Sequence, residues 1–312
     1  MMKYFKIFLL IPVVLFFVLG CSEQDAEEPA TQKPERDNLY MADEDTDEDV
    51  IKDSIEFDYN YIVDDLESKL SDEFIIKPHL YYVVVSNLSE TETDRLINHT
   101  ITAATECFYN NYFEKRPDEI TTIFLFKDEK SYKSWAKELY NDYGLSRFGY
   151  YKPSERVMLM NINTGSGTLV HEMTHALVRY DFPEIPAWFN EGLGSLYERC
   201  SLQNGKILGY VNWRLPDLQE PIEDGSYTSL KKLLKTNDDE FYGENSGFNY
   251  AQARYLCMFL QEKRMLREYY KAFRDNYETD KTGRKTLEEL YGKDLLELEK
   301  DYLNWVETLE YN

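Results

Sequence analysis

Two of the four histidines in this chain of 312 residues stand four positions apart, at His171 and His175 in the sequence HEMTH. Residues i and i+4 lie on one face of an α-helix about one turn apart, so a helix would bring the two imidazoles together. The flanking positions 169–170 and 176–178 are apolar, which predicts a buried helix. Unpaired imidazoles would be costly there, so the pattern favours a divalent metal with Glu172 beside it to activate water.

The segment PAWFNEGLGSLYE after this motif offers a third ligand, which a catalytic zinc site needs if its fourth position is left for water. Prolines predict that the first helix ends near Tyr180 and that a second begins at Pro186. His175 lies five residues before Tyr180 and Glu191 lies five after Pro186. An antiparallel helix pair would place them level, so Glu191 is predicted to bind the metal.

Two glycines and a second acid follow Glu191 on the predicted helix. Gly192 and Gly194 are unusual in a helix interior, and their lack of a side chain would allow a close approach by a neighbouring element. Glu198 lies two turns beyond Glu191 on the same face. It is either an acceptor for a ligand imidazole or a solvated acid, and the spacing alone leaves both interpretations open.

The hydrophobic pattern predicts an α+β fold in which strands mix with helices before residue 166 and helices dominate after it. Strands are expected at Leu80–Ser86, Ile120–Phe126, Phe148–Lys152 and Arg156–Met160. Helices are expected at Thr91–Phe113, Glu129–Tyr140, Tyr227–Lys235, Tyr250–Lys263, Arg267–Tyr277 and Leu287–Glu310. The folded part therefore divides into a strand-rich N-terminal lobe at 57–165 and a mostly helical C-terminal lobe at 166–312.

HEMTH followed by PAWFNEGLGSLYE resembles the gluzincin metallopeptidases, most of all their peptidase MA-like group, and the WxNEG piece also resembles the aminopeptidase branch. The resemblance extends over most of residues 75–305. It implies a zincin-like fold with a mixed sheet in the N-terminal lobe. It also implies that His171, His175 and Glu191 bind Zn²⁺ and that Glu172 is the general base.

The chain departs from the thermolysin-like pattern at two points. Ser195 stands where those enzymes place an Asp that orients the first ligand histidine, so that role passes to Glu198, a backbone carbonyl or another acid. No histidine follows His175, so a Tyr or Arg must stabilise the oxyanion. Tyr250 resembles the tyrosine of the aminopeptidase branch, and Arg254 lies one turn later; Tyr250 is either the catalytic hydroxyl or a packing residue.

The first 20 residues have the pattern of a lipoprotein signal peptide. Lys3 and Lys6 precede an uncharged run at 7–19 that is too short to span a ~30 Å hydrocarbon core comfortably. The run closes on Val-Leu-Gly-Cys21, which resembles a bacterial lipobox, although Leu19 stands where Ala or Ser is more usual. A lipid on Cys21 would anchor the exported chain to a membrane at the cell envelope.

Residues 21–56 are predicted to be a disordered tether, because residues 22–53 carry 13 acids and 3 bases with few apolar residues. The whole chain has a formal net charge of −23, which would repel nucleic acid and argues against nucleic-acid binding. Outside the cytosol, Cys107, Cys200 and Cys257 permit at most one disulfide, whose pairing the spacing does not decide.

These features predict a surface-tethered zinc endopeptidase that acts on a peptide or protein substrate. The stretch before HEMTH lacks a GxMEN-like motif that would capture a free α-amine, which favours an endopeptidase over an aminopeptidase. Glu155 could supply such an acid, so aminopeptidase activity remains an alternative. A second alternative is a lipoprotein that keeps the zincin fold to bind a partner with little turnover.

Overall fold

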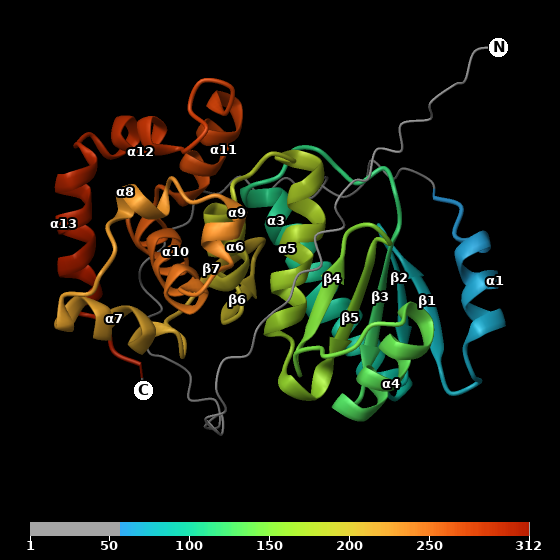
Figure 1. Cartoon of the computed structure of the whole chain (residues 1–312). Coiled ribbons are helices and arrows are strands. Elements are labelled where there is room, and N and C mark those ends of the chain that lie inside the picture. The colour runs from blue at the N-terminus through green and yellow to red at the C-terminus, as the bar shows by residue number, and fades with distance from the viewer. Residues whose placement is uncertain (1–56, 312) are drawn as a thin grey trace, which may run out of the picture.

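The computed structural model describes residues 57–311, and its arrangement of helices and strands is shown in Figure 1. The predicted signal peptide, the lipidation site Cys21 and the acidic tether lie outside the described residues. Within the described range, no helix combines the length and apolar character needed to cross a membrane.

One mixed sheet forms the centre of the N-terminal lobe, with strand order β1-β2-β3-β5-β4. Its strands are β1 (Ile75–His79), β2 (Tyr82–Ser86), β3 (Thr121–Phe126), β4 (Gly149–Lys152) and β5 (Val157–Asn161). The central strands β2, β3 and β5 are parallel, and the edge strands β1 and β4 pair antiparallel to their neighbours. The central strands are rich in β-branched, aromatic and other apolar residues, which suits strands buried on both faces.

Helices account for most of the remaining described residues. The N-terminal lobe contains α1 (Asn60–Lys69), α2 (Glu90–Leu96), the π-helical η1 (Ile97–Thr102), α3 (Ala103–Asn111), α4 (Glu129–Tyr140) and the 3₁₀ turn η2 (Ile162–Thr164). The C-terminal lobe contains α5 (Gly167–Asp181), α6 (Ala187–Leu196), α7 (Leu215–Asp224), α8 (Leu230–Leu233), α9 (Asp238–Phe241), α10 (Ser246–Glu262), α11 (Leu266–Asn276), α12 (Arg284–Tyr291) and α13 (Leu295–Val306). The fold is therefore mixed α+β, as the sequence predicts.

Successive side chains of the central strands point to opposite faces of the sheet, and each face has its own core. On one face, Val83 and Val85 of β2 pack with residues of α1 and α4. On the other face, Tyr82 and Val84 pack with α3 and α5 in the larger core, which continues into the C-terminal helices. The helix α5 thus lies between the sheet and the helical lobe, as Figure 1 shows.

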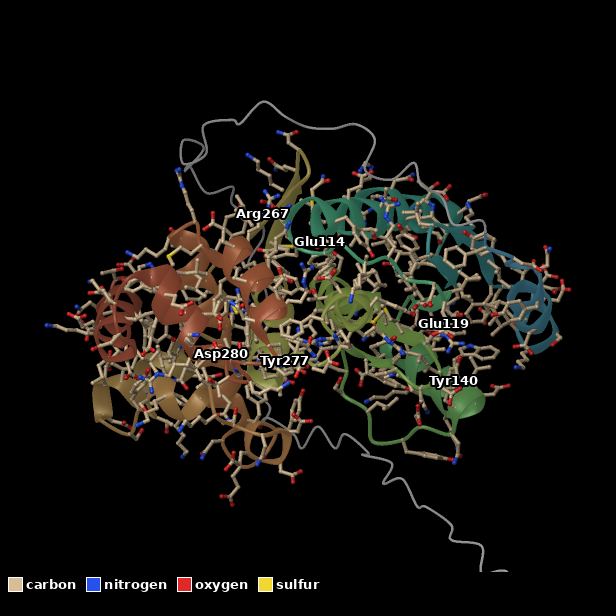
Figure 2. All side chains as sticks on the ribbon, turned by 90° about the horizontal axis from the view of Figure 1, so that it is seen from above. Glu114, Glu119, Tyr140, Arg267, Tyr277 and Asp280 are labelled. Atoms are coloured by element: carbon tan, nitrogen blue, oxygen red, sulfur yellow. The ribbon has the colours of Figure 1, made fainter. Side chains whose placement is uncertain are left out.

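Asp181, the last residue of α5, ties the two lobes together. Its side chain is fully buried and accepts hydrogen bonds from the backbone N–H groups of Glu114 and Lys115, at 2.7 and 2.8 Å. From α11, Tyr270 donates to Asp181 at 3.0 Å and Arg274 pairs with it at 2.9 Å. Arg274 also pairs with Glu114, which Figure 2 labels where the helical lobe meets the sheet-bearing lobe.

Several predicted elements have different boundaries in the structure. The helix expected at Thr91–Phe113 is divided by the π-helical η1 into α2 and α3. The helix expected at Leu287–Glu310 is wrong as one element, because Gly292 adopts a left-handed φ of 74° and ends α12. Asp294 then caps the start of α13. The helix expected at Tyr250–Lys263 begins earlier, at Ser246.

The strand content after residue 166 is higher than the sequence suggested. A two-stranded hairpin, β6 (Cys200–Gln203) and β7 (Lys206–Gly209), follows α6. Its turn residues Asn204 and Gly205 both adopt positive φ, as tight hairpins require. Cys107 on α3, Cys200 on β6 and Cys257 on α10 are free thiols in the structure.

Candidate metal centre

The helix α5 carries both histidines of HEMTH on one face. Their Nε2 atoms lie 2.9 Å apart, and the His171 ring is buried at 8% exposure. The Nδ1 atom of His175 lies 2.9 Å from Oδ1 of Asn190. When this Nδ1–H donates to Asn190, Nε2 keeps its lone pair for a metal, so Asn190 selects the tautomer that a ligand histidine needs.

The helix α6 brings Glu191 to the same point, as the antiparallel helix pair predicts. Glu191 Oε2 lies 3.3 Å from Nε2 of His171 and 3.4 Å from Nε2 of His175. This oxygen is buried without a hydrogen-bond partner, whereas Oε1 accepts a hydrogen bond from Tyr242 at 2.7 Å. A buried carboxylate oxygen that faces two imidazole nitrogens has the position of a metal ligand.

The spacing of these three atoms fits a metal ion. Ligand atoms of His171, His175 and Glu191 all lie within 4.8 Å of one another. In a tetrahedral site with bonds of about 2.0–2.2 Å, neighbouring ligand atoms are roughly 3.3–3.6 Å apart. The two histidine–glutamate distances agree with this value, and the two Nε2 atoms would separate by roughly half an ångström on metal binding. Two histidines and a glutamate can therefore hold a divalent ion.

The electrostatics of the cluster also favour a positive charge at its centre. Burial by itself lowers the pKa of His171, but the nearby carboxylates of Glu191 and Glu198 outweigh burial and raise this pKa to about 10. The pKa of His175 is raised as well, because Glu191 outweighs burial. Burial opposes ionisation of Glu191, yet the two histidines hold its pKa well below the usual range. The surroundings thus stabilise cationic charge between the imidazoles and the carboxylate.

Glu172 lies next to this cluster without belonging to the three-ligand set. Its Oε2 accepts a hydrogen bond from the backbone N–H of Tyr151 on β4 at 3.1 Å. Burial raises the pKa of Glu172, the two histidines lower it, and the net change is upward. A carboxylate whose pKa is raised toward neutrality is suited to accept and return a proton.

Glu198 lies behind His171 with its side chain only 17% exposed, which favours the first of its two sequence interpretations. Its Oε1 lies 3.4 Å from Nδ1 of His171, slightly beyond normal hydrogen-bond length. Two side chains that the sequence did not single out bind Glu198: Asn212 donates to Oε2 at 3.1 Å, and Arg214 donates to both oxygens. Glu198 is therefore a half-buried acid that is paired with Arg214 and faces the His171 imidazole.

Two tyrosines approach Glu191 from the C-terminal lobe. Tyr242, directly after α9, donates to Glu191 Oε1 and was not singled out in the sequence. Tyr250 of α10 packs its ring 6.3 Å from that of Tyr242, centroid to centroid. Burial, followed by the nearby Glu191 carboxylate, raises the pKa of the Tyr250 phenol well above its usual value, so the hydroxyl stays protonated and can donate. Arg254 instead points to the backbone, where it donates to the carbonyl of Tyr210.

Gly192 and Gly194 allow close contact on two sides of α6. A Cβ at Gly192 would lie 2.8 Å from the carbonyl oxygen of Ala253 on α10. A Cβ at Gly194 would lie 3.1 Å from Cε1 of His175 and 3.3 Å from Cε1 of His171. The backbone at Gly194 therefore packs directly against the two imidazole rings.

Replacement of Gly194 by alanine is expected to displace the imidazoles and to weaken metal binding by roughly tenfold or more. Titration of the apoprotein with zinc against a competing chelator measures this loss. Gly247→Ala on α10 is the matched control, because a Cβ there would meet nothing within 4 Å. Equal affinities for the two variants would contradict the assigned role of Gly194.

The chain matches no protein-family model, and a search of curated proteins found no significant match.

Proposed function

We propose that this protein is a zinc-dependent peptidase whose metal ligands are His171, His175 and Glu191. The observation that carries this proposal is the buried, partnerless Oε2 of Glu191, which faces both Nε2 atoms beside a further carboxylate, Glu172. A site that only stored a metal would gain nothing from a neighbouring acid outside the ligand set. The combination of three ligands and a free acid supports hydrolysis.

Each of the surrounding residues has a chemical role in this reaction. When bound, zinc polarises the scissile carbonyl and makes water more acidic. Glu172 takes a proton from the attacking water and later delivers it to the leaving amine. The Tyr250 hydroxyl donates a hydrogen bond to the carbonyl oxygen as negative charge develops there. Asn190 and Glu198 hold the two imidazoles in the tautomer that leaves Nε2 free.

The position of β4 supports a peptide as the substrate. This strand is last in the sheet, so among the strands of residues 57–311 none pairs with its outer edge. The N–H of Tyr151 donates to Glu172, so the side chain proposed as the general base lies beside β4. An extended peptide that pairs with this edge would pass beside Glu172, as in other cases where a peptide adds a strand to a sheet.

The cellular setting is part of the proposal. The lipobox-like sequence at Cys21 supports lipid anchoring at the cell envelope, and the acidic segment would hold the peptidase away from the membrane surface. We infer endopeptidase rather than aminopeptidase activity, because no GxMEN-like motif precedes HEMTH.

Incubation of the zinc-loaded protein with a mixture of unstructured peptides tests the proposal. Mass spectrometry is expected to detect new internal termini, which disappear with a chelator and return when zinc is added back. A protein that binds zinc but leaves every peptide intact would instead support the alternative of a binding lipoprotein. Trimming from the N-terminus alone would support the aminopeptidase alternative.

The two tyrosines near Glu191 are expected to differ in kinetic effect. Tyr250→Phe should lower kcat by roughly 10²-fold or more without changing zinc affinity, because it removes an oxyanion donor. Tyr242→Phe should instead weaken zinc binding, because it removes the hydrogen bond to Glu191 Oε1. Steady-state kinetics on a peptide found in the screen, together with zinc titration, separate the two roles. A wild-type kcat for Tyr250→Phe would remove Tyr250 from the mechanism.

A further inference from the structure

Arg214, just before α7, is a nearly buried cation that faces the back of the metal centre. Its side chain is 14% exposed. It donates from Nε to Oε2 of Glu198 at 3.1 Å and from Nη2 to Oε1 at 2.9 Å. Two parallel hydrogen bonds from one guanidinium fix the plane of the carboxylate as well as its position.

The carboxylate that Arg214 fixes is the one that faces His171. Glu198 Oε1 lies 3.4 Å from Nδ1 of His171, on the side of the ring opposite the metal ligands. Without the guanidinium, Glu198 would be a half-buried acid that keeps the hydrogen bond from Asn212 but loses its charge partner. Arg214 therefore acts on the orientation of His171 through Glu198.

The same guanidinium also contacts the aromatic side of the site. Its Cζ lies over the Trp213 ring, 4.2 Å from the centroid, and over the Tyr250 ring, 5.0 Å from the centroid. A planar guanidinium stacks on aromatic faces in a way that a lysine ammonium does not reproduce. Arg214 thus touches both the acid behind a metal ligand and the tyrosine proposed to stabilise the oxyanion.

We propose that Arg214 is a positioning residue that sets two groups at once: the Glu198 carboxylate behind His171, and the ring of Tyr250. The first part of the proposal, which we call the Glu198 arm, concerns zinc affinity and can be tested in a protein that cleaves no peptide. The Tyr250 arm rests on the proposed peptidase function.

A double-mutant cycle in zinc affinity tests the Glu198 arm. Arg214→Lys keeps the positive charge but loses the two parallel N–H donors that hold the Glu198 carboxylate. This variant should bind zinc roughly tenfold more weakly than the wild-type protein. The Arg214→Lys/Glu198→Gln double variant closes the cycle with the same arginine substitution, and it carries no carboxylate that has lost its guanidinium partner. Its zinc affinity should equal that of Glu198→Gln alone, because Arg214 acts through Glu198.

Arg199→Met is the matched control, since Arg199 donates to the carbonyl of Val211 and braces the same loop without a hydrogen bond to Glu198. It should keep wild-type zinc affinity. Equal losses for Arg199→Met and Arg214→Lys, or additive losses for Arg214 and Glu198, would show that loop stability alone is at work and would overturn the Glu198 arm.

Kinetics test the Tyr250 arm. Arg214→Lys at saturating zinc should lower kcat several-fold with KM little changed, and the effect should vanish in a Tyr250→Phe background. A kcat effect that persists in that background would overturn this arm. A wild-type protein that cleaves no peptide would contradict the proposed function, while the zinc-affinity cycle would still decide the Glu198 arm.

Discussion

Replacement of Glu172 by glutamine is expected to lower peptide hydrolysis by roughly 10²–10⁴-fold, because the amide cannot accept the proton of the attacking water. The substitution keeps the size of the side chain and an oxygen that can accept the hydrogen bond from Tyr151 N–H. Zinc content should therefore stay near that of the wild-type protein. Cleavage rates and metal analysis on the same preparation measure both quantities.

Glu155→Gln is a suitable control for that variant, because Glu155 is exposed in the turn between β4 and β5. Under the endopeptidase proposal, Glu155→Gln keeps its activity. A loss confined to substrates with a free α-amine would point to the aminopeptidase alternative instead. Retained cleavage by Glu172→Gln would contradict the proposed mechanism.

Replacement of Asp181 by asparagine should have the largest effect on stability. Asparagine would leave the Arg274 guanidinium without its buried charge partner. Its NH2 group would also replace one of the two carboxylate oxygens that accept hydrogen bonds from the surrounding N–H groups. Loss of one partner from a buried ion pair costs about 3–5 kcal/mol. Asp275→Asn is the matched control, because Asp275 pairs with the same arginine but is 64% exposed, and such a pair contributes at most about 1 kcal/mol.

The contribution of Asp181 to the free energy of unfolding should depend on pH. Burial raises the pKa of Asp181, but the N–H groups of Lys115 and Glu114 and the Arg274 guanidinium outweigh burial and lower it below its usual value. Its contribution is thus fully present above the unfolded pKa of about 3.9 and is lost as the pH falls through the folded pKa. Urea unfolding at several pH values should show the wild-type and Asp181→Asn stabilities converging in acid. A difference independent of pH would contradict this assignment.

The cluster of proposed metal ligands, His171, His175 and Glu191, could be predicted from the sequence because local geometry brings the three side chains together. His171 and His175 meet through helical spacing, and Glu191 joins them through a short connection between two helices. The residues that hold these ligands could not be predicted in the same way. Arg214 and Tyr242 reach the centre through the packing of separate elements, and nothing in their local sequence marks them among 26 tyrosines and many charged residues.

The fold shows the same division between local and long-range information. Central strands such as β3 were predicted because apolar runs bury both faces. The edge strand β1 escaped notice because Pro78 interrupts its pattern. Two missed features did carry local signals: Asn204-Gly205 is a hairpin turn sequence, and Gly292 is a helix-terminating glycine. The π-helical η1 has no sequence signal that we can identify.

Anomalous diffraction across the zinc absorption edge, from crystals of the zinc-loaded protein, would show whether zinc occupies the cluster of His171, His175 and Glu191. We expect one zinc, about 2.0–2.2 Å from Nε2 of His171, Nε2 of His175 and an oxygen of Glu191, with a fourth position open towards Glu172. A zinc bound elsewhere, a site without Glu191, or a fourth protein ligand that closes the open position would contradict the assignment of this cluster as a catalytic metal centre.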